Sequence, residues 1–294
     1  MEQRIGVIGA GVMGKGVAQR FAKYGYRVIL LDNNPEVLKN AAGEIYRDLK
    51  VKSMFDKSVQ VQEIMERISV VQEYEEIRDV DFIIENVCEK EEIKKEVYEQ
   101  LKEIVKPDCI YLVNTSCIPI TRIGAYTETP ERVIGVHFMN PVPVKNFAEV
   151  ILGKKTSQDT IEKVGELLHS VQIDYEAVND SAGFVSNRVS HLFMNEAAFL
   201  VYEGVADAKQ IDNIFKKAFG HKMGPLETAD LIGIDTVVDS LEVLYKEYQD
   251  PKFRVCPLLR RMVEMGEVGR TVSYTHLRAL ETEADLVCRL LLEK

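Results

Sequence analysis

Two residues with acid–base chemistry, His137 and Glu149, stand on two apolar segments that a proline-rich turn separates. Each lies six residues from Pro143, so a reversal of the chain at this proline places the two side chains opposite one another on neighbouring strands. Cross-strand neighbours come close enough for a carboxylate to bond an imidazole. Such a carboxylate fixes the tautomer of the imidazole and stabilises its protonated form. The pattern predicts a general base that takes the proton of an alcohol during hydride transfer.

A second polar group, Asn114–Thr115–Ser116, follows a predicted strand at 109–113. Open α/β sheets bind ligands at the carboxyl ends of their strands, so the Ser116 hydroxyl could bond a substrate oxygen. A serine after Asn and Thr is also typical of a turn without a ligand, and this alternative stays open. The sequence has no nucleophile elbow, which argues against a Ser–His–Asp hydrolase. It has no cluster of metal ligands either, so we expect no metal.

A glycine turn, Gly9–Ala–Gly11–Val–Met–Gly14, could bind the redox cofactor that hydride transfer requires. The turn joins an apolar strand to a helical pattern, and the next strand ends at Asp32. A dinucleotide-binding βαβ unit has this order. Gly9 permits the tight turn, Gly11 lets N–H groups approach a pyrophosphate, and Gly14 allows close packing of helix on strand. Asp32 can accept hydrogen bonds from the adenosine ribose, and its charge repels a 2′-phosphate, which predicts NAD rather than NADP.

Alternating strands and helices in the first part of the chain predict an α/β fold with a Rossmann-type, doubly wound, mostly parallel sheet. The expected strands include 27–32, 68–71, 80–86, 109–113 and 133–137. From about Asp159 helices dominate, and the polar run 179–181 with Gly183 is a plausible joint. The expected helices include 35–50, 56–67, 91–105, 160–168, 184–201, 208–219, 236–248 and 258–265. We expect a dinucleotide-binding domain at 1–180 and an all-helical domain at 181–270.

Composition narrows the class of protein. The 294-residue chain has a formal net charge of −10, which disfavours nucleic acid and anionic membrane as partners. No apolar run approaches the roughly 20 residues of a membrane span. Five cysteines without CxxC spacing indicate reduced thiols, and the first strand begins almost at Met1, which leaves no room for a signal peptide. These features predict a cytoplasmic protein.

Together, the motifs resemble those of the short-chain L-3-hydroxyacyl-CoA dehydrogenase family, and most of all its bacterial 3-hydroxybutyryl-CoA dehydrogenases. The resemblance covers about residues 3–270. The segments that carry it are Gly9–Gly14, Glu85–Asn86 with Lys90, Asn114–Thr115–Ser116, His137–Phe–Met–Asn140–Pro141, Gly183–Phe–Val–Ser–Asn187–Arg188 and Met223–Gly224–Pro225–Leu–Glu227.

The resemblance implies an enzyme that oxidises (S)-3-hydroxyacyl-CoA, short-chain substrates above all, to 3-oxoacyl-CoA with NAD. It implies that His137 and Glu149 are the catalytic pair and that Ser116 and Asn187 belong to the active site. The helical domain of the family implies a homodimer.

The resemblance also implies cofactor contacts outside the glycine turn. Glu85 and Lys90 match an E-N-x-x-x-K segment of the family, which places them near the nicotinamide ribose. Asn140 matches the asparagine of the HFxNP motif and would lie beside cofactor or substrate.

Several positions depart from the family pattern, among them Cys117 and Pro119 after the active-site serine. The acyl group and its carrier therefore stay open, and the same reaction on acyl carrier protein is one alternative. A non-catalytic dinucleotide-binding protein of the same fold is another. Past Arg270 the sequence changes character, and 272–279 resembles a translated sequencing adapter. We interpret 271–294 as a non-native tail.

Overall fold

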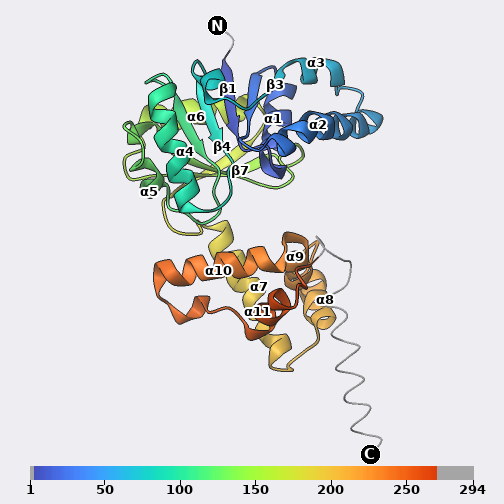
Figure 1. Cartoon of the computed structure of the whole chain (residues 1–294). Helices are drawn as coiled ribbons and strands as arrows, with labels where there is room; N and C mark the ends of the chain where they lie inside the picture. The colour runs from blue at the N-terminus through green and yellow to red at the C-terminus, as the bar shows by residue number, and fades with distance from the viewer. Residues whose placement is uncertain (1–2, 270–294) are drawn as a thin grey trace, which may run out of the picture. The chain divides into compact units, whose positions relative to one another are not determined.

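The computed structural model describes residues 3–269, which form two compact units that divide between Phe184 and Val185 (Figure 1). The first unit holds two clusters of buried apolar side chains, and the second unit holds a third. The predicted tail at 271–294 lies outside the described residues.

One sheet forms the centre of the first unit, with eight strands among the described residues in the order β3-β2-β1-β4-β5-β6-β7-β8. The strands are β1 (Arg4–Ile8), β2 (Arg27–Leu31), β3 (Ile68–Val71), β4 (Phe82–Glu85), β5 (Ile110–Val113), β6 (Val133–Phe138), β7 (Phe147–Leu152) and β8 (Asp174–Asn179). Strands β1 to β6 pair in parallel, β7 is antiparallel to β6, and β8 is parallel to β7. The predicted mostly parallel, Rossmann-type sheet is confirmed.

Helices cover both faces of this sheet (Figure 1). They are α1 (Val12–Lys23), α2 (Pro35–Phe55), α3 (Val61–Glu66), α4 (Glu91–Ile104), α5 (Ile120–Gly124) and α6 (Gln158–Ser170), with short 3₁₀ turns at Tyr74–Ile77 and Pro130–Arg132. Side chains of α1, α2 and α6 pack in one core cluster, and those of α4 and α5 pack in the other. Neighbouring strand residues alternate between the clusters, as Val7 and Ile8 do, because successive side chains point to opposite faces.

The second unit is helical in its described part, as predicted. Its helices are α7 (Ser186–Tyr202), α8 (Ala208–Phe219), α9 (Pro225–Ile232), α10 (Ile234–Tyr248) and α11 (Pro257–Glu264), with a 3₁₀ turn at Pro251–Phe253. Helix α8 has the predicted bounds because both ends carry strong signals. Asp207 and Gln210 form a capping box at its start, and Gly220 adopts a left-handed conformation (φ 72°) at its end.

Several elements differ from the expected ones. The helix expected at 56–67 is shorter, because α3 begins only at Val61 and ends at Glu66. Helix α5 was not predicted, since it has only five residues. Helix α2 runs five residues past Lys50 to Phe55, because no helix-breaking residue precedes Asp56. Strand β8 escaped prediction because none of its residues is buried, so it lacks an apolar pattern. Helix α9 was not predicted because it is short, although Pro225 occupies its first turn.

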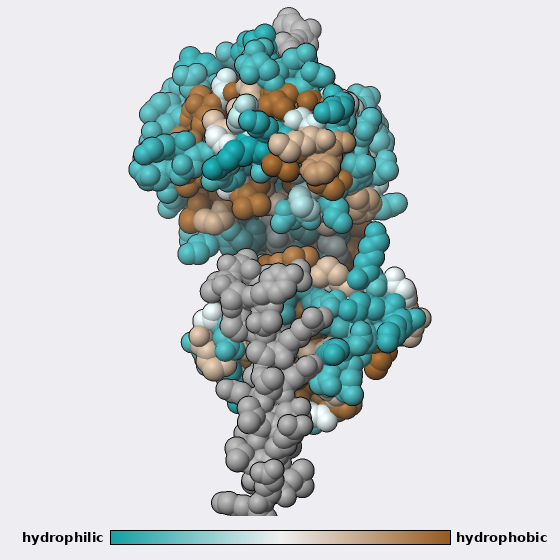
Figure 2. Space-filling model, turned by 90° about the vertical axis from the view of Figure 1, so that its right-hand side faces the viewer, coloured by the Kyte–Doolittle hydropathy of each residue, from teal (hydrophilic) through white to brown (hydrophobic). Residues whose placement is uncertain are grey.

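Within residues 3–269, no helix combines the length and apolarity that a bilayer crossing needs. Across the face in Figure 2, hydrophilic residues surround smaller groups of apolar ones.

Candidate active site

The glycine turn connects β1 to α1 in the close-packed form that its sequence predicts. A Cβ on Gly14 would lie 1.7 Å from the Gly9 carbonyl oxygen, and one on Gly9 (φ 93°) would lie 2.7 Å from the Asn86 carbonyl oxygen. A Cβ on Gly11 would have no neighbouring atom within 4 Å among the described residues. Gly9 and Gly14 are thus required by the protein itself, whereas Gly11 adjoins open space at the helix N-terminus. This arrangement fits a dinucleotide pyrophosphate.

Asp32 directly follows β2 and bonds the glycine turn. Its Oδ2 accepts a hydrogen bond from the Ala10 N–H at 2.7 Å, and its Oδ1 accepts one from the Asn34 N–H at 2.9 Å. The carboxylate therefore lies beside the turn, where the ribose of a dinucleotide is held in this class of fold.

Glu85, at the end of β4, has a fully buried side chain. Lys94 Nζ, also fully buried, lies 2.7 and 2.9 Å from its two carboxylate oxygens, and the Val87 N–H donates to Oε1 at 2.8 Å. Burial raises the pKa of Glu85, against the opposing effect of Lys94. Lys90 is exposed and precedes α4. In this structure the side chain that bonds Glu85 is thus Lys94, and ribose contacts from Glu85 and Lys90 stay predictions.

Glu89 bonds the turn that carries Ser116. Its Oε1 accepts hydrogen bonds from the Thr115 hydroxyl at 2.6 Å, from the Ser116 N–H at 3.0 Å and from the Cys117 N–H at 2.8 Å. One carboxylate oxygen thereby fixes the backbone on both sides of Ser116. The sequence patterns did not indicate a role for Glu89, because it lies in an irregular loop without periodicity.

Lys94 was also missed, although its sequence carried a signal. It shares the buried face of α4 with Val97, Tyr98 and Leu101. A lysine on such a face requires a buried partner.

His137 and Glu149 occupy directly opposed positions of the antiparallel β6–β7 pair. His137 Nδ1 lies 3.2 Å from Glu149 Oε2, and the two side chains are 13% and 5% exposed. An ionised carboxylate only accepts hydrogen bonds, so Nδ1 donates and the neutral ring carries its lone pair on Nε2. The predicted pairing of the two side chains is confirmed, and with Glu149 ionised it favours the tautomer that a base requires.

Asn114 connects the strand ends that carry these residues. Its Nδ2 donates to Asn86 Oδ1 at 2.7 Å, and its Oδ1 accepts the Phe138 N–H at 3.4 Å. The ends of β4, β5 and β6, with the Ser116 turn and the His137 strand, therefore meet at one edge of the sheet. Ser116 and His137 thus belong to one region of the first unit.

The structure gives the positions of Asn140 and Asn187 but does not test the roles predicted for them. Asn140 is exposed in the turn after β6. Asn187 lies at the second position of α7 in the second unit, where its carbonyl oxygen lies 2.8 Å from His191 Nδ1. Their roles stay predictions. Among residues 3–269, no group of three or more His, Cys, Asp or Glu side chains could hold a metal ion.

Comparison with known proteins identifies relatives for both units. The family model described as "3-hydroxyacyl-CoA dehydrogenase, NAD binding domain" matches residues 4–180, and "3-hydroxyacyl-CoA dehydrogenase, C-terminal domain" matches residues 183–275. A Bacillus subtilis (strain 168) protein named "Probable 3-hydroxybutyryl-CoA dehydrogenase" is 43% identical over 272 residues, which cover 91% of this chain and 94% of the relative. A 3-hydroxybutyryl-CoA dehydrogenase of Bradyrhizobium diazoefficiens is 38% identical, with coverages of 91% and 92%.

A solved structure agrees with these matches. The crystal structure of (S)-3-hydroxybutyryl-CoA dehydrogenase from Ralstonia eutropha superposes with a TM-score of 0.87 at 34% identity and covers 92% of this chain and 97% of that one.

Proposed function

Because the chain belongs to the 3-hydroxyacyl-CoA dehydrogenase family, we propose that it catalyses the reversible, NAD-dependent oxidation of a short-chain (S)-3-hydroxyacyl-CoA, 3-hydroxybutyryl-CoA above all, to the 3-oxoacyl-CoA. The observation that carries the proposal is the His137–Glu149 pair, a base with a fixed tautomer on the strand next to the Ser116 turn. Such a pair serves the removal of a hydroxyl proton.

His137 supplies the acid–base step. Its Nε2 takes the proton of the substrate hydroxyl, and Glu149 stabilises the imidazolium that results. Bound at the glycine turn, NAD would supply the acceptor for the hydride that leaves C3 of the substrate. In the reverse direction the protonated His137 returns its proton to the oxygen at C3.

Ser116 and Asn187 serve to orient the substrate in this proposal. The Ser116 hydroxyl bonds the oxygen at C3 or the thioester oxygen, and Glu89 keeps the backbone of Ser116 in place for it. Asn187, from the helical unit, holds a substrate oxygen as the family resemblance implies. Hydrogen bonds of this kind favour the enolate-like form of the thioester.

The cofactor site consists of the glycine turn with Gly9, Gly11 and Gly14, and of Asp32. The N–H groups at the start of α1 would bind the pyrophosphate, and the Asp32 carboxylate would accept hydrogen bonds from the adenosine ribose. The negative charge of Asp32 disfavours a 2′-phosphate, so we expect NAD to bind more tightly than NADP.

The carrier of the acyl group is coenzyme A in this proposal, with acyl carrier protein as the alternative. Lys50 and Lys57, near the end of α2, are exposed and offer positive charge to a phosphate. Lys52 is less available because its Nζ donates to Gln19 Oε1 at 3.0 Å.

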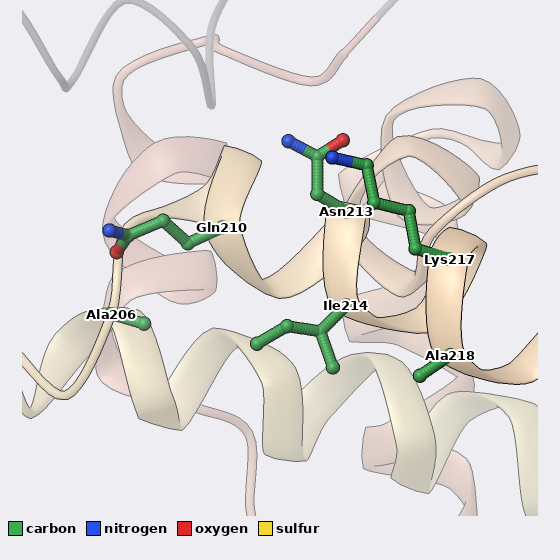
Figure 3. Close-up of a pocket in the computed structure, with 6 residues that line it drawn as sticks. All are labelled: Ala206, Gln210, Asn213, Ile214, Lys217 and Ala218. Carbon is green, nitrogen blue, oxygen red and sulfur yellow. The ribbon is translucent and has the colours of Figure 1, made fainter.

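We expect the chain to form a homodimer through its helical unit. Exposed apolar side chains lie on or beside α8, among them Val205, Ile214 and Phe219. Ile214 also lines a pocket together with Ala206, Gln210, Asn213, Lys217 and Ala218. Figure 3 shows Ile214 and Ala218 on one side of α8 and the polar ends of Asn213 and Lys217 on the other. Contiguous exposed apolar surface is typical of protein interfaces.

The test is a steady-state assay of NADH oxidation with acetoacetyl-CoA and, separately, with acetoacetyl acyl carrier protein. Turnover with the first substrate and little with the second supports the proposal. The opposite preference assigns the carrier protein as substrate. Binding of NADH without turnover of either substrate would favour the non-catalytic alternative.

A further inference from the structure

Phe184, the last residue of the first unit, packs its ring against the imidazole of His137. We infer that Phe184 is a positioning residue, whose ring holds the imidazole in the orientation needed for proton transfer. The inference rests on the proposed function for its catalytic meaning, but the contact itself does not depend on that function.

The contact has the geometry of an attractive aromatic pair. The ring centroids are 5.9 Å apart with planes inclined by 59°, and Phe184 is only 3% exposed. Tilted pairs at such distances are favourable. Glu149 restrains one edge of the imidazole at Nδ1, and the Phe184 ring restrains the ring as a whole. The two contacts together determine where Nε2 points.

The backbone of Phe184 indicates that this placement has a cost. Its φ of 51° lies in the left-handed region, which side chains with a Cβ rarely adopt, and it follows Gly183 at φ 73°. Strained residues of this kind persist only where their surroundings hold them, and they concentrate at functional sites. A glycine at position 184 would avoid the strain but would present no ring to His137.

Two backbone hydrogen bonds hold this segment in place. The Phe184 N–H donates to the Ser181 carbonyl oxygen at 3.0 Å, and the Gly183 N–H donates to the Cys117 carbonyl oxygen at 3.4 Å. The second bond joins the segment to the residue that follows Ser116. Phe184 is thus connected through its backbone to the predicted substrate-binding turn and through its ring to the predicted base.

The ring of Phe184 also belongs to a core cluster, so a purely structural role is the competing explanation. Phe184→Leu removes the ring and keeps an apolar side chain. We expect kcat with acetoacetyl-CoA to fall about 10- to 100-fold, since small misplacements of reacting groups cost this much. We expect KM to change by no more than about twofold, because a ring that positions the base affects the transition state and not ground-state binding. Phe184→Tyr keeps the ring and should restore kcat to near the parental value.

Phe82→Leu is the matched control. Phe82 is 4% exposed and begins β4, at the opposite edge of the sheet from the strand ends that carry the site. It should lower the melting temperature but leave kcat unchanged. Parental kcat in folded Phe184→Leu, or an equal loss of kcat in both leucine variants, would overturn the inference.

An NMR measurement on the full-length protein tests the contact between Phe184 and His137 independently of turnover. With ¹⁵N-labelled histidine, the His137 signals are assigned by their loss in His137→Gln. We expect nuclear Overhauser contacts between the His137 imidazole and a phenylalanine ring in the parent protein, absent in Phe184→Leu and present in Phe82→Leu. If Phe184→Leu does not fold, the parent spectrum decides, and lack of the contact there overturns the inference. An inactive parent with the contact present would instead contradict only the proposed function.

Discussion

Lys94 on α4 and Glu85 at the end of β4 form an ion pair from which solvent is excluded. Both side chains are 0% exposed, and Lys94 Nζ also lies 3.4 Å from the carbonyl oxygen of Asn114. The pair therefore joins α4 to the ends of β4 and β5, and the side chain of Asn114 in turn donates to Asn86. A buried charge that loses its partner is costly, because desolvation is no longer compensated.

Lys94→Met should destabilise the protein by about 3–5 kcal/mol, because it leaves the Glu85 carboxylate buried without a countercharge. Burial already raises the pKa of Glu85, and the variant removes the group that lowers it. The folded state then prefers the protonated acid, so stability is retained below the unfolded pKa and lost as pH rises through the folded pKa. Urea unfolding at about pH 5 and about pH 8 measures this difference, which should be greater at the higher pH.

The double variant Lys94→Met with Glu85→Gln controls for lost packing. It removes both charges and should recover much of the stability at the higher pH. A single variant whose stability loss does not change with pH would contradict the assignment of an unpaired Glu85 charge.

Tyr98→Phe should leave stability unchanged or raise it slightly. The Tyr98 hydroxyl is fully buried and has no hydrogen-bond partner among the described residues. Folding therefore removes its hydrogen bonds to water and provides none in their place. Tyr126→Phe is the matched comparison, because the Tyr126 hydroxyl donates to Glu91 Oε1 at 2.5 Å. That variant should lose about 1 kcal/mol. Thermal unfolding of the two variants measures the contrast, and a clear loss in Tyr98→Phe would imply a partner for its hydroxyl.

Local sequence patterns were sufficient for strands β1 to β7 and for the His137–Glu149 pair on β6 and β7. The reversal at Pro143 and the alternation along both strands determine that His137 faces Glu149, and both signals can be read from neighbouring residues. Helix α8 was equally predictable from local sequence, because Asp207 and Gly220 cap its two ends. These features depend on short-range physics.

Contacts between loops could not be read in the same way. The carboxylate of Glu89 bonds residues 26 to 28 positions further along the chain, and no spacing rule predicts such a bond. The pairing of Glu85 with Lys94 depends on how α4 packs on the sheet. The E-N-x-x-x-K match indicated Lys90 instead of Lys94. The role of Asn187 depends on a second unit and stays a prediction.

Asp32→Asn should narrow the preference for NADH over NADPH. The asparagine oxygen can still accept the hydrogen bond from the Ala10 N–H, but the charge that repels a 2′-phosphate is gone. We expect the ratio of the two dissociation constants to fall by about tenfold or more. Asp32→Ala also loses the bond to the glycine turn, so it should weaken NADH binding further than Asp32→Asn does. Fluorescence titration with both cofactors measures these constants, and equal affinities in the parent protein would refute the role of Asp32.

The substitutions His137→Gln and Glu149→Gln should each disable the same pair of side chains. The first removes the group that accepts the proton and should lower kcat by roughly 10²–10⁴. The second keeps the shape of Glu149 but removes the charge that stabilises the imidazolium, so it should lower kcat as well. Since each variant disables the same pair, the double variant should lose far less than the product of the two single losses.

Both substitutions lie outside the glycine turn, so the dissociation constant of NADH should stay near the parental value in all three variants. The loss should also appear in kcat rather than in KM, because the pair acts on the transition state. The measurement is kcat for acetoacetyl-CoA reduction in the parent, the two single variants and the double variant. Near-parental turnover in His137→Gln would exclude this histidine as the acid–base group, and strictly multiplicative losses would show that the two residues act separately.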